Sequence, residues 1–255
     1  ASARDTTLSS GGSMLVSFGA VAEDTSVQRG GRLWVYSGGT ASDTEVSSSG
    51  TATADFKGTL KGVTVASGGF VSAVNQGIVS GMDIQPGGQS LAYNGAKAVS
   101  ATVSGTLAVS SNAVLSTAHI LSGGTVSARR GCTAKDIGVD GGRLFLYEYC
   151  DASGLDIGSG GSALFAEMTS AEGIVLSSGA SCTASSYVAL SGVTVSEGGR
   201  LFLWANTSAT DVTVESGGSL AVGSGCTAAN VTSADGAVIA VSDGGHVEYA
   251  EQGGI

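Results

Sequence analysis

A glycine recurs about every 19 residues along this chain of 255 residues, and this repeat, which we call the glycine mark, constrains the fold more than any other feature. Self-similarity at a fixed period of this length is typical of one structural unit stacked on copies of itself. We therefore expect a repeat protein whose function lies on an extended surface. The mark first ends, as SSGG, at Gly12, and it recurs at Gly31, Gly50, Gly69, Gly88, Gly105, Gly124, Gly142, Gly161, Gly179, Gly199, Gly218 and Gly236.

Between the marks, the residues alternate with the period of a strand that buries one face. The second and fourth residues after the marked glycine are mostly apolar, as in Leu33 and Val35, and another apolar residue, such as Val27, precedes it by four positions. Glycine corners supply positive φ without a steric penalty and let the chain turn sharply. We therefore expect each repeat to form at least two short strands. The whole chain predicts an all-β, parallel β-solenoid of about 13 coils.

The composition fits one elongated domain over residues 1–255. Glycine accounts for 42 residues, proline for 1 and charged residues for 13% of the chain. The glycines lack the three-residue period of collagen, and the apolar residues keep a strict phase that disordered chains lack. No stretch approaches the roughly 20 apolar residues of a membrane-spanning helix, and no secretory leader is visible. We expect an excised, mature segment that is not embedded in a membrane, with one irregular, bulged coil over residues 180–192.

The amino-acid sequence of the repeats resembles that of a known family. The units DTSVQRGGRLWVYSGGTASDTEVSSSGTA and VTVASGGFVSAVNQG are similar to the passenger repeats of AIDA-type autotransporter adhesins of Gram-negative bacteria, which order T-x-V, GG, an alternating strand, GG and T-A in the same way. The resemblance covers almost the whole chain. It implies a right-handed β-helix displayed extracellularly, on the bacterial cell surface, by an outer-membrane barrel that lies C-terminal to this segment.

The resemblance also implies the function and the partners. It points to cell adhesion, self-association or biofilm growth, with a host-cell receptor or glycan, or another copy of the chain, as the partner. Family members are heptosylated on Ser and Thr by dedicated glycosyltransferases, so a glycoprotein is expected. We interpret the chain as a non-catalytic adhesin or self-association module. One alternative is an inert stalk that projects a separate head domain.

The other alternative is a β-helical carbohydrate-active enzyme, which needs a groove with two or three convergent carboxylates. The acidic residues are scattered along the chain, and Asp5, Asp24 and Asp43 occupy equivalent positions that suit turn formers. A G-D-S-G nucleophile turn is absent from the sequence. We therefore expect no enzymatic activity.

The net charge of the chain and its few metal-ligating residues limit the kinds of partner that it can bind. The net charge of −10 disfavours nucleic acid and anionic lipid, which both require a basic surface. The sequence has two histidines, His119 and His246, and no C-x-x-C motif. We expect neither a metal site nor a cofactor.

Four cysteines depart from the family pattern. Cys132 and Cys150 are 18 residues apart, about one coil, which places them on neighbouring strands. Neighbouring strands lie about 4.8 Å apart, within the roughly 4.4–6.8 Å that a disulfide accepts between Cα atoms. A disulfide and a buried stack of thiols both remain open for this pair. Cys182 and Cys226 are more than two coils apart and are expected to be unpaired.

The outward side of the repeat carries the candidate binding residues. Three repeats share the phrases GGRLWVY, GGRLFLY and GGRLFLW, whose first, third and fifth residues after the glycine face outward if the second and fourth face inward. Arginine and aromatic side chains of this kind suit a binding surface. The alternative is that the rings stack to stabilise the sheet or are covered by another segment. We call this set the aromatic column: Arg32, Trp34, Tyr36, Leu91, Tyr93, Arg143, Phe145, Tyr147, Arg200, Phe202 and Trp204.

Overall fold

The computed structural model describes residues 1–251, and its regular elements are all β-strands. The strands belong to two compact units, Ala1–Thr133 and Ala134–Ile255. The last four residues of the predicted 1–255 solenoid lie outside the described part. A single domain over the whole length remains a prediction.

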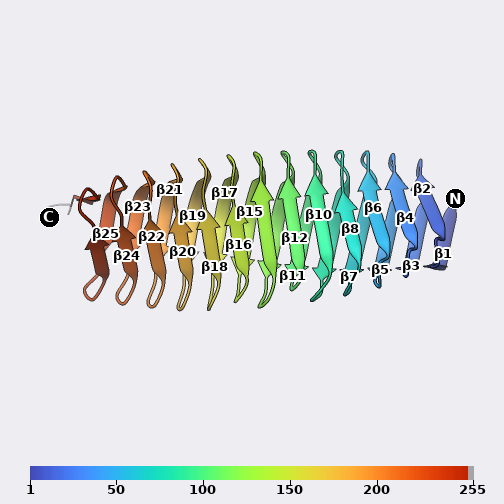
Figure 1. Cartoon of the computed structure of the whole chain (residues 1–255), viewed down its shortest axis with the longest axis horizontal. Coiled ribbons are helices and arrows are strands. Elements are labelled where there is room, and N and C mark those ends of the chain that lie inside the picture. The colour runs from blue at the N-terminus through green and yellow to red at the C-terminus, as the bar shows by residue number, and fades with distance from the viewer. Residues whose placement is uncertain (252–255) are drawn as a thin grey trace. The chain divides into compact units, whose positions relative to one another are not determined.

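In the first unit, strands of seven residues alternate with strands of four or five residues (Figure 1). The long strands are β1 (Ser2–Leu8), β3 (Val21–Val27), β5 (Thr40–Val46), β7 (Thr59–Val65), β9 (Ile78–Ile84), β11 (Lys97–Val103) and β13 (Val114–Ile120). The short strands are β2 (Ser13–Ser17), β4 (Arg32–Tyr36), β6 (Thr51–Asp55), β8 (Phe70–Ala73), β10 (Gln89–Tyr93), β12 (Thr106–Ser110) and β14 (Thr125–Arg129).

The second unit continues the same alternation. Strand β15 (Thr133–Val139) begins at the boundary between the units. The other odd-numbered strands are β17 (Asp151–Ile157), β19 (Ser170–Leu176), β21 (Ala189–Val195), β23 (Ser208–Val214), β25 (Thr227–Ser233) and the shorter β27 (His246–Tyr249). The even-numbered strands are β16 (Arg143–Leu146), β18 (Ser162–Phe165), β20 (Ser181–Ala184), β22 (Arg200–Leu203), β24 (Ser219–Val222) and β26 (Val238–Val241).

Within each unit, a strand pairs in parallel with the equivalent strand of the next coil. Val21 of β3 pairs with Thr40 of β5, and Arg200 of β22 pairs with Ser219 of β24, so one coil is about 19 residues. Long strands thus form one sheet and short strands another. This pairing confirms the predicted all-β, parallel β-solenoid of about 13 coils.

Each long strand bends at its fourth residue, which has positive φ. The φ angles are 49° at Asp5, 52° at Asp24 and 53° at Asp43. The bend shifts the alternation, so that the second, fifth and seventh residues of the strand all point into the coil, as Ala22, Thr25 and Val27 do in β3. These aspartates are turn formers as expected. The sequence did not show that the turn lies inside a strand.

The interior of the coils is a stack of small and medium apolar side chains. The inward residues of the short strands are buried as predicted, including Leu33, Val35, Leu144 and Leu146. Phe165 is the largest fully buried side chain. Columns of buried Ala, Val, Leu and Ile fill the interior, and the hollows described below are lined by residues of the strand surfaces and corners.

The coil over residues 180–192 is regular. Ser181 of β20 pairs with Ser162 and Arg200, and Ala189 of β21 pairs with Ser170 and Ser208, without a register shift. The bulge that we expected there is therefore absent from these strands. The reason is that Ala180 occupies the position that Gly161 and Gly199 hold in the neighbouring coils, so the coil keeps its length of 19 residues although its second glycine is missing. A register shift occurs instead between Ala228 and Val231, where β25 pairs with β27.

Candidate functional site

The structure places the aromatic column on the outward side of the short strands. Trp34, Tyr36, Tyr93 and Trp204 are 45%, 36%, 42% and 48% exposed. The three arginines of the column are exposed, and Leu91, Phe145, Tyr147 and Phe202 are half-buried. The predicted direction of these side chains is therefore correct, while a binding role for them remains a prediction.

Register divides the column into separate patches within each unit. In the first unit, Trp34 is followed by Thr53, Ser72 and then Leu91 along the column. In the second unit, Phe145 is followed by Leu164, Thr183 and then Phe202. Each unit thus carries two apolar patches three coils apart, with smaller side chains between most of them.

Ring contacts strengthen two of these patches. The rings of Phe145 and Tyr147 are stacked, with centroids 6.2 Å apart and planes 8° from parallel. Tyr36 contacts Phe56 of the following corner, with centroids 5.1 Å apart at 58°. Such pairs stabilise the sheet on their own account, so the alternative that these rings have a structural role is supported for Tyr36, Phe145 and Tyr147.

Hollows adjoin two of the three arginines of the column. Arg32 and Trp34 line a hollow of about 270 Å³ with Thr51 and Thr53. Arg200 and Phe202 line another of about 440 Å³. Trp204 covers Gly223 of the next coil, where an added Cβ would lie 2.8 Å from Cε3 of the indole ring. The glycine therefore provides the space in which the indole lies.

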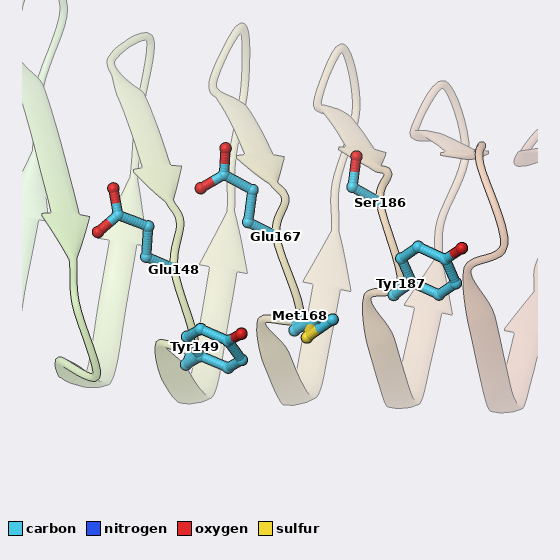
Figure 2. Close-up of a pocket in the computed structure, with 6 residues that line it drawn as sticks. All are labelled: Glu148, Tyr149, Glu167, Met168, Ser186 and Tyr187. Carbon is cyan, nitrogen blue, oxygen red and sulfur yellow. The ribbon is translucent and has the colours of Figure 1, made fainter.

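An apolar groove that the sequence did not predict lies at a corner of the second unit. Figure 2 shows two rows of side chains along successive coils. One row contains Glu148, Glu167 and Ser186, and the other contains Tyr149, Met168 and Tyr187. The open cavity between them has a volume of about 330 Å³. We call it the corner groove.

The apolar row of the corner groove is exposed and conformationally unusual. Tyr149, Met168 and Tyr187 are 65%, 52% and 61% exposed. Their φ angles are 64°, 61° and 63°, a region that bulky residues rarely adopt. Glycine occupies the equivalent corner position in some other coils, including Gly38 and Gly225, and in the remaining coils Lys57, Gln76, Asn112 and Asn206 occupy it with φ of 60–67°. The sequence signal for this groove was the presence of large apolar residues at one corner position in three successive coils.

The two carboxylates of the groove bear on the enzyme alternative. Glu148 and Glu167 occupy equivalent positions of adjacent coils and extend in the same direction (Figure 2). Glycosidases instead hold two carboxyl groups on either side of the scissile bond. Among the described residues that line the groove, none is basic. The arrangement suits attraction of a cation better than acid–base catalysis.

A polar corner in the first unit forms a ladder of amides. Asn75 Nδ2 donates to Asp55 Oδ1 at 2.9 Å, and Asn94 Nδ2 donates to Asn75 Oδ1 at 2.6 Å. These hydrogen bonds join three successive coils. The adjoining hollow of about 380 Å³ is lined partly by Phe56 and Lys57. Because Asp55, Asn75 and Asn94 form hydrogen bonds with one another, we assign these side chains a role in stabilising the corner.

The cysteines are all buried. The Cys132 thiol donates to the carbonyl oxygen of Arg129 at 2.7 Å, and Cys150 is fully buried. A disulfide between these two remains a prediction. Cys182 and Cys226 are free, as expected. Burial raises the pKa of Cys182 to about 12, so its thiol stays protonated and unreactive at neutral pH.

The described residues contain no group of three or more His, Cys, Asp or Glu side chains placed to hold a metal ion. They also contain no helix long and apolar enough to span a membrane.

Comparison with solved structures shows what the chain resembles. A crystal structure of a fragment of TibA, hyper-glycosylated by TibC, matches with a TM-score of 0.79 and 28% identity, over 97% of this chain and 99% of the fragment. This match supports the predicted resemblance to AIDA-type autotransporter passenger repeats. No protein-family model matches the sequence, and no curated protein matches it.

A further solved structure matches this chain less well. The A-module of mannuronan C-5 epimerase AlgE4 from Azotobacter vinelandii matches with a TM-score of 0.44 and 11% identity, over 95% of this chain and 84% of that module. A likeness at this level supports no conclusion about activity.

Proposed function

We propose that this chain is a non-catalytic, surface-displayed adhesin or self-association module that binds through the outward side of its short strands. The observation that carries the proposal is the match to the TibA fragment over almost the full length of both chains. The exposed arginines and aromatic rings of the aromatic column supply the contacts. Repeated weak contacts on a stiff scaffold give an avidity that one coil cannot supply.

The proposal places the chain outside the cell with a host-cell receptor, a glycan or a second copy as its partner. It also includes glycosylation, since the similar TibA fragment is hyper-glycosylated by TibC. Ser and Thr side chains on the outer faces are the candidate acceptors for heptose. Co-expression with a glycosyltransferase of the TibC type should raise the intact mass in steps of one heptose.

The test of adhesion uses a variant that combines Trp34→Ala, Phe145→Ala, Phe202→Ala and Trp204→Ala. We expect it to lose at least about tenfold in binding to epithelial cells or to itself, because exposed aromatic anchors dominate binding energies. Circular dichroism must show that the β-structure is unchanged. Leu121→Ala combined with Val175→Ala removes exposed apolar residues elsewhere and serves as the matched control.

Two other results would contradict parts of the proposal. Unchanged binding by the fourfold variant would make the column structural and would favour the stalk alternative. Turnover of a polysaccharide that Glu148→Gln and Glu167→Gln abolish would favour the enzyme alternative.

A further inference from the structure

The excess of acidic over basic residues lies in one of the two units. The first unit contains seven Asp and Glu against eight Lys and Arg, whereas the second contains fourteen against three. The net charge of −10 therefore comes from the second unit. A charge imbalance of this size attracts cationic partners and accelerates their encounter.

The corner groove is where this acidic unit also presents apolar surface. Glu167 is exposed and Glu148 is half-buried, and both flank the row formed by Tyr149, Met168 and Tyr187. Tyr149 and Tyr187 lie two coils apart, which is roughly 10 Å at the spacing of strands. The groove therefore offers two aromatic faces and a thioether along one line, with carboxylates along the other.

The apolar row occupies a corner position at which any residue other than glycine is strained. A non-glycine residue in the left-handed region costs roughly 1–2 kcal/mol, and three consecutive coils bear this cost at Tyr149, Met168 and Tyr187. Glycine at the equivalent corners, such as Gly225 with φ of 72°, avoids it. Lys57, Gln76 and Asn206 bear the same strain at this position, so what distinguishes the apolar row is its exposed apolar surface and not its backbone.

We propose that the corner groove binds an extended, arginine-containing peptide segment of a partner protein. Guanidinium groups stack on tyrosine faces and bond to carboxylates in the same planar geometry. In an extended peptide, side chains on one face repeat about every 7 Å. Two flexible arginines on that face therefore span the distance between Tyr149 and Tyr187, with Met168 against the backbone or an aliphatic stem between them.

Charge decides against a second copy of this chain as the occupant. The second unit contains Lys135, Arg143 and Arg200 as its basic residues, and the first unit is close to neutral. In addition, no two arginines of this chain are two or four residues apart, the spacing that places side chains on one face of an extended segment. The groove is also separate from the aromatic column, so this proposal goes beyond the adhesin function proposed above.

The test titrates a fluorescent peptide of about eight residues, alternating Gly and Arg, against the whole chain at physiological salt. We expect saturable binding at one site and none with the peptide in which uncharged citrulline replaces arginine. A variant combining Tyr149→Gly, Met168→Gly and Tyr187→Gly should weaken binding about tenfold or more. Its thermal stability should be unchanged or higher, since glycine relieves the strain at each corner. A purely structural role for the row predicts a loss of stability.

Matched controls separate the groove from general electrostatics. Glu167→Gln should weaken binding about threefold, whereas Glu172→Gln, which makes the same change in charge at an exposed position of β19, should not. Asn206→Gly changes the same corner position one coil further on and should leave binding intact.

Three results would overturn the proposal. They are no binding of the arginine peptide, equal weakening by Glu167→Gln and Glu172→Gln, and displacement of the peptide by spermidine at equal concentration. Cell adhesion is measured on the same variants. Loss of peptide binding with adhesion intact would leave the adhesin proposal standing, and the fourfold column variant should still bind the peptide.

Discussion

At the scale of single residues, the two glycines of one mark serve different purposes. Gly38 has φ of 79° and open space around the position of a Cβ. Gly39 lies so close to the preceding coil that a Cβ would be 2.2 Å from the carbonyl oxygen of Val16. The first glycine supplies a conformation, and the second allows two backbones to approach.

This difference predicts that substitution by alanine lowers the stability of the fold by different amounts at the two glycines. Gly38→Ala should lower the free energy of unfolding by about 1 kcal/mol through strain alone. Gly39→Ala should lower it by about 3 kcal/mol or more, because the backbone of the coil must shift. Urea denaturation of both variants measures the two values. Equal effects would mean that the approach of the coils is not what requires the second glycine.

At the scale of the strand, two buried hydroxyls stand out in the long strands of the first unit. Thr25 of β3 and Thr44 of β5 are neighbours in register and are each 1% exposed, and neither Oγ1 atom has a hydrogen-bond partner. The next residue of the same column is Val63, which is also buried. Valine therefore fits this column, and the threonines bear an uncompensated desolvation cost.

Thr44→Val should therefore raise the free energy of unfolding by about 1 kcal/mol. The measurement is the shift of the urea midpoint at constant slope. Thr53→Val is the control, since its hydroxyl lies 3.0 Å from Ser72 Oγ in a hydrogen bond and its loss should not stabilise the chain. A destabilised Thr44→Val would show that the hydroxyl has a partner in solution.

At the scale of the whole molecule, the two tryptophans report on the two units separately. Trp34 belongs to the first unit and Trp204 to the second. The variants Trp34→Phe and Trp204→Phe each leave one fluorescent reporter. If the chain is one cooperative domain, as the unbroken repeat predicts, both reporters should show the same urea midpoint. Two separate midpoints, with the far-ultraviolet circular dichroism following both, would establish two domains.

The sequence by itself determined the solenoid, its period and the direction of its side chains. Glycine spacing and alternation are local properties of each coil, so Leu33 and Trp34 could be assigned to opposite sides without a structure. The tertiary structure decided what depends on neighbouring coils. Stacking placed Tyr149, Met168 and Tyr187 in one row, divided the aromatic column into patches, and kept residues 180–192 in register. Those features arise from contacts between residues about 19 positions apart, where small differences in corner conformation accumulate and no single repeat records them.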